Sequence, residues 1–89
     1  MRLIKTTGQF ERDYKRMARR GLAMDKLKSI MRLLAEGTKL DPRHRDDKLT
    51  GSYAGRRECH IEPDWLLIYV PADTEIIFER TGAHADLFE

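Results

Sequence analysis

The 89-residue sequence has a single cysteine, Cys59, and no long run of apolar residues. One thiol cannot close an intramolecular disulfide, which is typical of proteins that fold in a reducing cytoplasm. Without a stretch of about 18 apolar residues, a membrane-spanning helix is not predicted. The first five residues, Met1 to Lys5, are too few and too charged for a signal peptide. We therefore expect a soluble, cytoplasmic protein with no membrane partner.

The sequence also lacks a glycine-rich phosphate-binding loop. Its three histidines stand at spacings that match no compact zinc-ligand motif, so a zinc site formed with Asp64 is a weak alternative. Cys59 and His60 are neighbours in a predicted strand, and their side chains therefore point to opposite faces. That placement argues against a cysteine–histidine nucleophile pair. We predict neither a metal nor another cofactor.

The two halves of the chain carry opposite net charges, although the net charge of the whole chain is only +2. Residues 1–48 carry 14 Lys and Arg against 7 Asp and Glu, whereas residues 49–89 carry 3 against 8. Such polarity usually presents a basic face to a polyanion, and nucleic acid is the commonest one. The alternative is that the basic helices are only well solvated.

Two amphipathic helices are predicted in the first half of the chain. Thr6 and Gln9 form a capping-box pattern that starts the first helix, and Gly21 ends it. The second helix runs from about Met24 to Glu36 and is closed by Gly37. Each helix has one narrow apolar stripe, so the two should form an antiparallel hairpin that packs on another layer.

Four strands are predicted beside these helices, at residues 2–5, 53–61, 65–70 and 75–81. Residues 38–52 show no periodicity and are predicted to form one long loop, a feature that is often functional. In the last strand, Ile76, Phe78 and Arg80 alternate and are expected to share one face. The order βααβββ predicts an α+β fold over a single domain, residues 1–89, with the helical hairpin on a small antiparallel sheet.

Four polar residues are brought together by this connectivity. His60 lies near the end of one strand and Asp64 opens the next. Arg80 and His84 lie at and beyond the end of the last strand, which is the hairpin partner of the strand that Asp64 opens. All four should therefore converge at one edge of the sheet.

This set suits the cleavage of RNA by attack of its own 2′-hydroxyl. Imidazoles titrate near neutrality and serve as base or acid, and a guanidinium matches phosphate oxygens. Asp64 would act as a base or orient an imidazole. The alternative is that His60 is a packed strand histidine and His84 a solvated tail residue.

The run from His60 to Tyr69, HIEPDWLLIY, and the ending from Phe78 to Phe88, FERTGAHADLF, resemble the YafQ family of RelE-superfamily bacterial toxins. The segment Leu49 to Ser52 and the helical hairpin fit as well, so the resemblance covers nearly the whole chain. It implies a RelE-like fold and a type II toxin that binds in the ribosomal A site and cuts mRNA there without a metal.

The resemblance also implies roles and partners. Carried over by position, His84 is the general acid, and His60 and Asp64 are its partners in acid–base work. Arg80 holds the scissile phosphate, Phe88 contacts the substrate and Trp65 supports that substrate site. The expected partners are the 70S ribosome with its rRNA and mRNA, and an antitoxin of the DinJ type that binds a monomeric toxin in a hetero-oligomeric complex.

One position departs from the family pattern. Members tend to carry a histidine two positions before the leucine of the Leu-x-Gly segment. In this chain that position is Asp47, which is followed by Lys48. Either His44 swings in from three residues upstream, or Asp47 acts as the base, or the enzyme is slower. We expect the loop from Arg43 to Lys48 to contact RNA, together with the basic helix from Arg12 to Arg20.

Two other functions share the scaffold. A non-catalytic toxin of the gyrase-poison type acts by protein binding and, by the family pattern, lacks the histidine and aspartate set. A plain basic RNA-binding domain binds RNA without cutting it. Fold alone does not choose among these functions.

Overall fold

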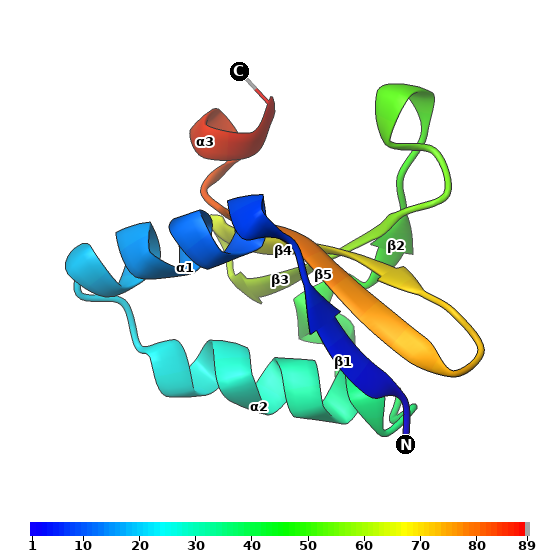
Figure 1. Cartoon of the computed structure of the whole chain (residues 1–89). Coiled ribbons are helices and arrows are strands. Elements are labelled where there is room, and N and C mark those ends of the chain that lie inside the picture. Colours follow the sequence, from blue (N-terminus) through cyan, green and yellow to red (C-terminus); the bar gives the residue numbers. More distant parts are fainter. Residues whose placement is uncertain (89) are drawn as a thin grey trace.

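The computed structural model describes residues 1–88, and its architecture is α+β, as predicted (Figure 1). The elements follow in the order β1 (Leu3–Thr6), α1 (Gly8–Arg19), α2 (Met24–Ala35), η1 (Pro42–His44), β2 (Asp47–Lys48), η2 (Gly51–Tyr53), β3 (Arg57–Glu62), β4 (Trp65–Pro71), β5 (Glu75–Gly82) and α3 (His84–Phe88). None of the helices in this part of the chain is long and apolar enough to cross a membrane.

The five strands form one sheet in the order β1-β5-β4-β3-β2. Strands β3, β4 and β5 form the predicted antiparallel meander. Strand β1 pairs parallel with β5, so the sheet is mixed and the expectation of a purely antiparallel sheet was wrong. The connection makes this possible: the chain leaves β1 through the helical hairpin and returns to the sheet only with the later strands, and parallel strands require such a long crossover.

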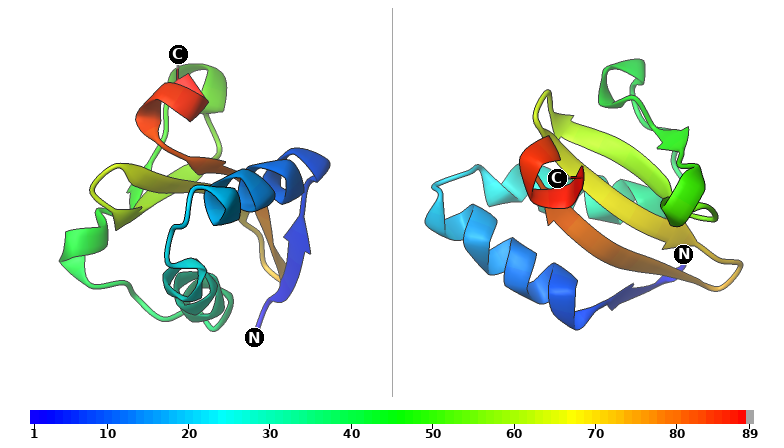
Figure 2. Two further views of the ribbon diagram at one scale, coloured as in Figure 1. Left: turned by 90° about the vertical axis from the view of Figure 1, so that its left-hand side faces the viewer. Right: turned by 90° about the horizontal axis from the view of Figure 1, so that it is seen from above.

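Helices α1 and α2 cover one face of the sheet and enclose the main core (Figure 2). Helix α1 begins one residue later than predicted, because the capping residue is Thr7, whose Oγ1 accepts a bond of 3.0 Å from the Phe10 amide. Gln9 donates instead to Asp13 within the helix. Cys59 and Ile61 of β3 are buried against this layer, as their alternation predicted.

The segment from 38 to 52 is more ordered than predicted. It contains the 3-10 turn η1 and the short strand β2, which pairs with the start of β3, and the second 3-10 turn, η2, begins in it at Gly51. Aperiodic sequences conceal such elements, since two or three residues are too few to show a period. Strand β3 also begins later than predicted, at Arg57 instead of Tyr53, because residues 51–53 form η2.

A bulge at Glu79 changes the direction of Arg80. Tyr69 pairs with Phe78 and Ile68 pairs with Arg80, which leaves Glu79 without a partner on β4. Ile76 and Phe78 face the helices, but beyond the bulge Arg80 lies opposite Ile68, on the other face of the sheet. The expectation that Arg80 shares a face with Ile76 and Phe78 was wrong for this reason.

The second face of the sheet is covered only in part. Helix α3, in the segment after the last predicted strand, and the segment around η2 both stand on this face (Figure 1). The Tyr53 hydroxyl of η2 donates to the Leu87 carbonyl oxygen of α3 at 3.2 Å. A small apolar cluster of Leu66, Ile68 and Leu87 holds α3 to the sheet, with Leu49 and Tyr53 packed against it. The rest of this face carries the polar residues.

Candidate active site

His84 is oriented by Asp64 at the entrance to α3. The Asp64 carboxylate accepts from the His84 backbone amide at 3.1 Å and contacts the ring Nδ1 at 3.1 Å. These two bonds lower the pKa of Asp64. A carboxylate only accepts, so the proton of a neutral His84 ring lies on Nδ1 and leaves Nε2 for chemistry. Both side chains are exposed, at 57% and 72%, and the ring is therefore accessible to a substrate.

His60 lies beside His84, with the two ring centroids 6.0 Å apart. Its Nδ1 lies 3.1 Å from the carbonyl oxygen of Pro63, and its Nε2 lies 3.5 Å from a carboxylate oxygen of Glu58. Glu58 was missed from the sequence. The available signal was alternation along β3, which puts residues 58 and 60 on one face. The His60 and Glu58 side chains are only 13% and 21% exposed, and with the exposed Asp64 and His84 they form an acid–base cluster of two carboxylates and two imidazoles.

Arg80 is held by a buried carboxylate on α1. Its Nε lies 2.7 Å and its Nη2 3.3 Å from the two oxygens of Asp13, which is fully buried. The same carboxylate accepts from the Thr81 amide at 3.2 Å. Bonding to Asp13 raises the pKa of Arg80, which keeps the guanidinium charged. The fork geometry of Arg leaves Nη1 without a bond to Asp13.

Asp13 is a second residue that the sequence reading missed. The signal was present, because a charged residue stands in the apolar stripe between Phe10 and Met17 at helical spacing. A carboxylate at a core-facing position needs a cationic or N–H partner, since a buried charge without one is very costly. Here the partner is Arg80, a residue of the predicted site.

Phe88 and Trp65 hold different positions. Phe88 is 41% exposed and lies edge-on to Tyr53 at 5.5 Å, with the His84 ring 5.8 Å away. It is therefore free to contact a ligand beside His84. Trp65 is only 2% exposed, and its indole N–H donates to Thr81 Oγ1 at 2.9 Å. Burial removes Trp65 from direct substrate contact and gives it a supporting position behind the last strand.

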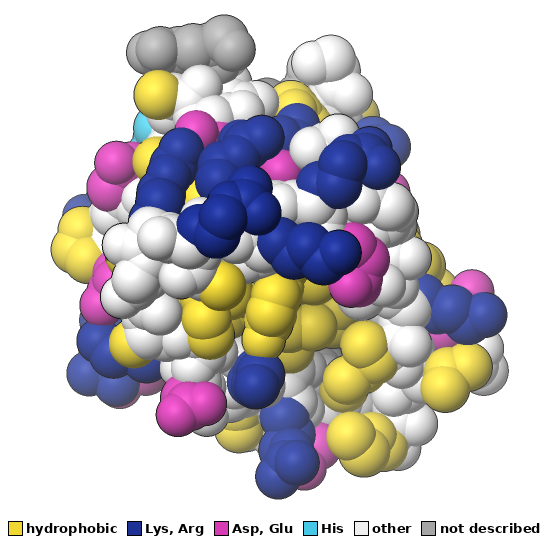
Figure 3. All heavy atoms as spheres, turned by 60° about the vertical axis from the view of Figure 1, so that its left-hand side comes forward, with side chains coloured by type: hydrophobic (Ala, Val, Ile, Leu, Met, Phe, Trp, Pro, Cys, Tyr) yellow, Lys and Arg dark blue, Asp and Glu magenta, His cyan; other side chains and the backbone are white. Residues whose placement is uncertain are grey.

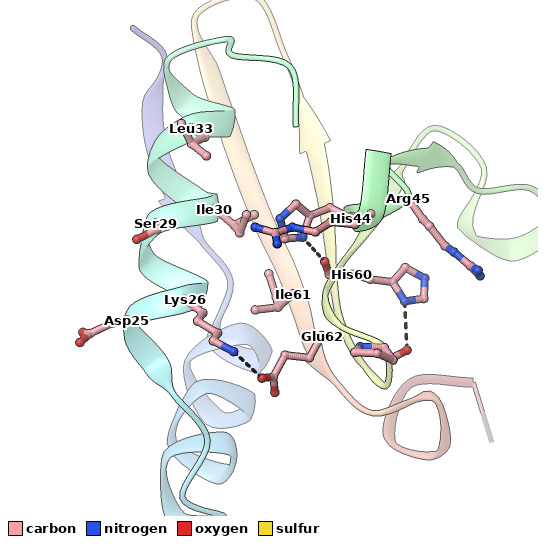
Figure 4. A pocket seen from close by; sticks show the side chains of 12 residues that line it. Asp25, Lys26, Ser29, Ile30, Leu33, His44, Arg45, His60, Ile61 and Glu62 are labelled. Carbon is pink, nitrogen blue, oxygen red and sulfur yellow. Dashed lines mark hydrogen bonds and ion pairs between the residues drawn. The ribbon is translucent and has the colours of Figure 1, made fainter. Parts of the chain in front are cut away.

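The two replacements considered for the loop histidine are placed on opposite sides. Asp47 on β2 pairs directly with Glu58, so its side chain shares a face with His60. His44 donates from Nδ1 to the His60 carbonyl oxygen at 2.6 Å and lies in the groove between α2 and β3 (Figure 4). The exposed Lys48, which follows Asp47 on β2, pairs with Arg57. The structure thus brings Asp47, and not His44, to the face that carries His84.

The groove behind β3 is large and borders this cluster only at His60. It measures about 990 Å³ and lies between α2, η1 and the end of β3. Figure 4 shows the His60 ring pointing away from α2, toward the Pro63 turn. Within residues 1–88, no group of three or more His, Cys, Asp or Glu side chains is placed to hold a metal ion.

A basic surface lies next to α3. Lys and Arg side chains gather on the face that α1 presents (Figure 3). Arg12, Lys15 and Arg19 of α1 and its C-cap residue Arg20 are exposed, and Arg16 is half-buried. We call these five residues the α1 basic face. It continues toward the end of the chain that carries His84, because Arg20 contacts α3 through Asp86.

The chain is similar to known proteins along nearly its whole length. The family described as a bacterial toxin of type II toxin–antitoxin systems, YafQ, matches residues 2–89. The mRNA interferase toxin YafQ of Escherichia coli (strain K12) is 46% identical over 86 residues, which cover 96% of this chain and 94% of that protein.

Two solved structures have the same fold. The crystal structure of YafQ from E. coli strain BL21(DE3) superimposes with a TM-score of 0.95 at 43% identity, over 100% of both chains. YafQ in the E. coli DinJ–YafQ complex superimposes with a TM-score of 0.93 at 43% identity, again over 100% of both chains. The sequence motifs, the fold and these matches agree: the chain belongs to the YafQ family of bacterial toxins of type II toxin–antitoxin systems.

Proposed function

We propose that this chain is an mRNA interferase that cleaves mRNA in the ribosomal A site by acid–base catalysis. The observation that carries the proposal is the His84 imidazole, which Asp64 orients and which lies 6.0 Å from the His60 ring on an exposed face. Acid–base cleavage of RNA needs two proton-transfer groups, one that removes the proton of the 2′-hydroxyl and one that protonates the leaving 5′-oxygen. The related E. coli protein carries the name mRNA interferase toxin, in agreement with this chemistry.

The proposed mechanism assigns each group a proton or a charge. A base removes the proton of the 2′-hydroxyl, and the 2′-oxygen attacks the adjacent phosphorus. His84 acts as the imidazolium, with Nδ1–H bonded to Asp64, and gives its Nε2 proton to the departing 5′-oxygen, which leaves the neutral ring. Arg80 stabilises the extra negative charge on the phosphoryl oxygens, as its fixed fork suits a phosphate. Phe88 contacts the substrate beside His84, and Trp65 supports β5 from behind.

The base comes from the carboxylates and imidazole around His60. His60 is contacted by Glu58, and Asp47 shares their face. Asp47 therefore takes the position for which the family pattern would supply a histidine, and His44 remains outside the mechanism. A carboxylate is a weaker base than an imidazole at neutral pH, so the enzyme should be slower than relatives that carry histidine there.

Ribosomal RNA is the proposed ligand of the α1 basic face and of the segment from Arg43 to Lys48. These residues are mostly exposed cations on a chain whose net charge is only +2. Binding to RNA phosphates releases counterions and therefore falls steeply with salt.

The double variant Arg12→Gln, Lys15→Gln should weaken ribosome binding without altering the fold. Each lost phosphate contact lowers the slope of log affinity against log salt by about 1. Binding measured by filtration at several salt concentrations checks this. Lys39→Gln, which removes one positive charge outside the α1 basic face, serves as the control. An unchanged slope in the double variant would remove α1 from the RNA interface.

A cognate antitoxin of the DinJ type is the proposed protein partner, in the cytoplasm. A related YafQ is found in complex with DinJ. The α1 basic face offers an acidic antitoxin segment a complementary surface, which would also block its use by ribosomal RNA. On this proposal the toxin is a monomer within a hetero-oligomeric complex.

The experiment that tests the function is translation of a defined mRNA in vitro followed by primer extension, in parallel reactions with and without ribosomes. The proposal is supported if the mRNA is cut at one codon position and only when ribosomes are present. The cuts should also persist when a chelator is added after translation has been arrested. Arrested growth with intact mRNA and altered DNA supercoiling would instead indicate a toxin that acts by protein binding. RNA bound but uncut would indicate a plain RNA-binding domain.

A further inference from the structure

Asp86 occupies a confined position at the start of α3. Its Oδ2 accepts from the Ala83 backbone amide at 2.9 Å, in the manner of a capping box closed from the third helical position. Gly82 makes room for it, because a Cβ at residue 82 would lie 2.9 Å from the Asp86 Cβ. The lack of a side chain at Gly82 therefore allows the first turn of α3 to fold tightly onto the end of β5.

The same carboxylate ties α3 to α1. Arg20 donates to both of its oxygens, from Nη1 at 2.7 Å and from Nη2 at 3.0 Å, and Arg16 lies 3.7 Å away. A two-pronged arginine–carboxylate pair fixes orientation as well as distance. The Asp86 side chain is only 14% exposed, whereas His84 and Asp64 are exposed at 57% and 72%.

The position of His84 therefore depends on more than its contact with Asp64. An exposed pair of this kind contributes little by itself, because solvent and salt screen it. His84 is the first residue of α3, directly after Ala83, whose amide Asp86 caps. Whatever fixes this turn fixes the backbone from which the imidazole projects.

We propose that Asp86, clamped by Arg20 and Arg16, is a positioning residue that holds His84 at its place beside His60. This inference rests on the proposed catalytic role of His84. Asp86 touches neither substrate nor reacting atoms in the proposed mechanism; it acts through the turn at Ala83. A misplacement of about 1 Å at a catalytic group is enough to lower a rate about 100-fold.

Acid unfolding gives one measure of how firmly Asp86 is held. Bonding to Arg20 is the main cause that lowers the pKa of Asp86 from 3.8 to about 2. As the pH falls, the Asp86 carboxylate is therefore protonated in the unfolded chain at a higher pH than in the folded chain. The stabilisation is complete above about pH 4 and is lost as the pH falls toward 2. Asp86→Asn should flatten the fall of the unfolding free energy over this window, measured by urea titration at several pH values.

The positioning role is tested with Asp86→Asn and Asp86→Ala in the full chain. The rate of a single round of cleavage is measured at saturating ribosome, ribosome affinity is measured separately, and the His84 ring is followed by NMR. We expect both variants to lose about 10- to 100-fold in the saturated rate. Ribosome affinity should be unchanged or higher, and the His84 ring resonances should shift. Lys26→Gln, which breaks the 2.8 Å ion pair with Glu62 away from α3, is the control and should keep the full rate.

The outcomes separate this inference from the proposed function. The positioning role alone would be overturned if His84→Gln is inactive while Asp86→Asn is fully active and its His84 ring resonances do not shift. A fully active His84→Gln would overturn the proposed function itself. Should Asp86→Ala fail to fold, Asp86→Asn decides, because it preserves the shape of the side chain.

Discussion

His84→Gln is expected to lower the rate of mRNA cleavage by about 100- to 10,000-fold, the usual range for loss of one acid–base group. Glutamine approximates the size and hydrogen bonding of the ring but cannot donate a proton to the 5′-oxygen. The fold should be unaffected, since His84 is exposed at the start of α3 and the helix is held by Leu87 and Asp86. Primer extension at saturating ribosome measures the rate, and circular dichroism with thermal unfolding checks the fold.

The matched control for this variant is Lys28→Gln, an exposed residue on α2. It should cleave at the normal rate. Both variants should also bind ribosomes equally well, so that the difference appears only in the chemical step. Cleavage by His84→Gln at the rate of the control would exclude His84 as the general acid. It would also exclude the proposed role of Asp64 in orienting the His84 ring for catalysis.

Asp13→Ala is expected to affect stability most, with a loss of about 2–4 kcal/mol in the free energy of unfolding. The carboxylate is fully buried and binds Arg80, the Thr81 amide and Gln9. Its removal leaves the Thr81 amide without this acceptor inside the core and leaves a part-buried guanidinium unpaired. The estimate lies below that for a fully buried pair, because the Arg80 side chain is 24% exposed. Urea titration gives the free energy.

Asp13→Ala should also reduce the rate of cleavage, because Arg80 loses the carboxylate that orients its guanidinium. A double-mutant cycle with Arg80→Ala separates the two effects. If the contact between the two side chains accounts for most of the loss, the double variant will be less unstable than the sum of the single variants. Additive losses, or a change below about 0.5 kcal/mol in Asp13→Ala, would mean that this pair does not hold β5 to α1.

Some elements of the fold could be predicted from the sequence because their apolar residues follow a regular pattern. Apolar stripes at helical spacing predicted α1 and α2, and the continuous apolar run at residues 65–70 predicted β4 in the centre of the sheet. The convergence of Asp64 with His84 followed from connectivity alone, since β4 and β5 are consecutive antiparallel strands. The family resemblance, drawn from the two motifs, is confirmed by the match over residues 2–89.

Other parts depend on contacts that leave no periodic signal. The parallel pairing of β1 with β5 is decided by the whole chain, and the bulge at Glu79 by a single extra residue. The bulge sends Arg80 to the face of His60, which strict alternation would have forbidden. The position of Asp47 opposite Glu58 depends on β2, a strand of two residues. Asp13 and Asp86 escaped notice because each acts through a partner distant in sequence, whereas Glu58 lies only two residues from His60 and could have been found by strand alternation.

The central claim is that this cluster cuts RNA with the substrate's own 2′-hydroxyl. The most direct measurement uses two ribosome-bound mRNAs that differ only in a 2′-deoxy nucleotide on the 5′ side of the cut. The proposed mechanism predicts cleavage of the all-ribose mRNA, with a 2′,3′-cyclic phosphate or its hydrolysis product on the upstream fragment, and no cleavage of the deoxy mRNA. Cleavage of the deoxy mRNA at the same position and rate would contradict it, since no internal nucleophile would then be needed.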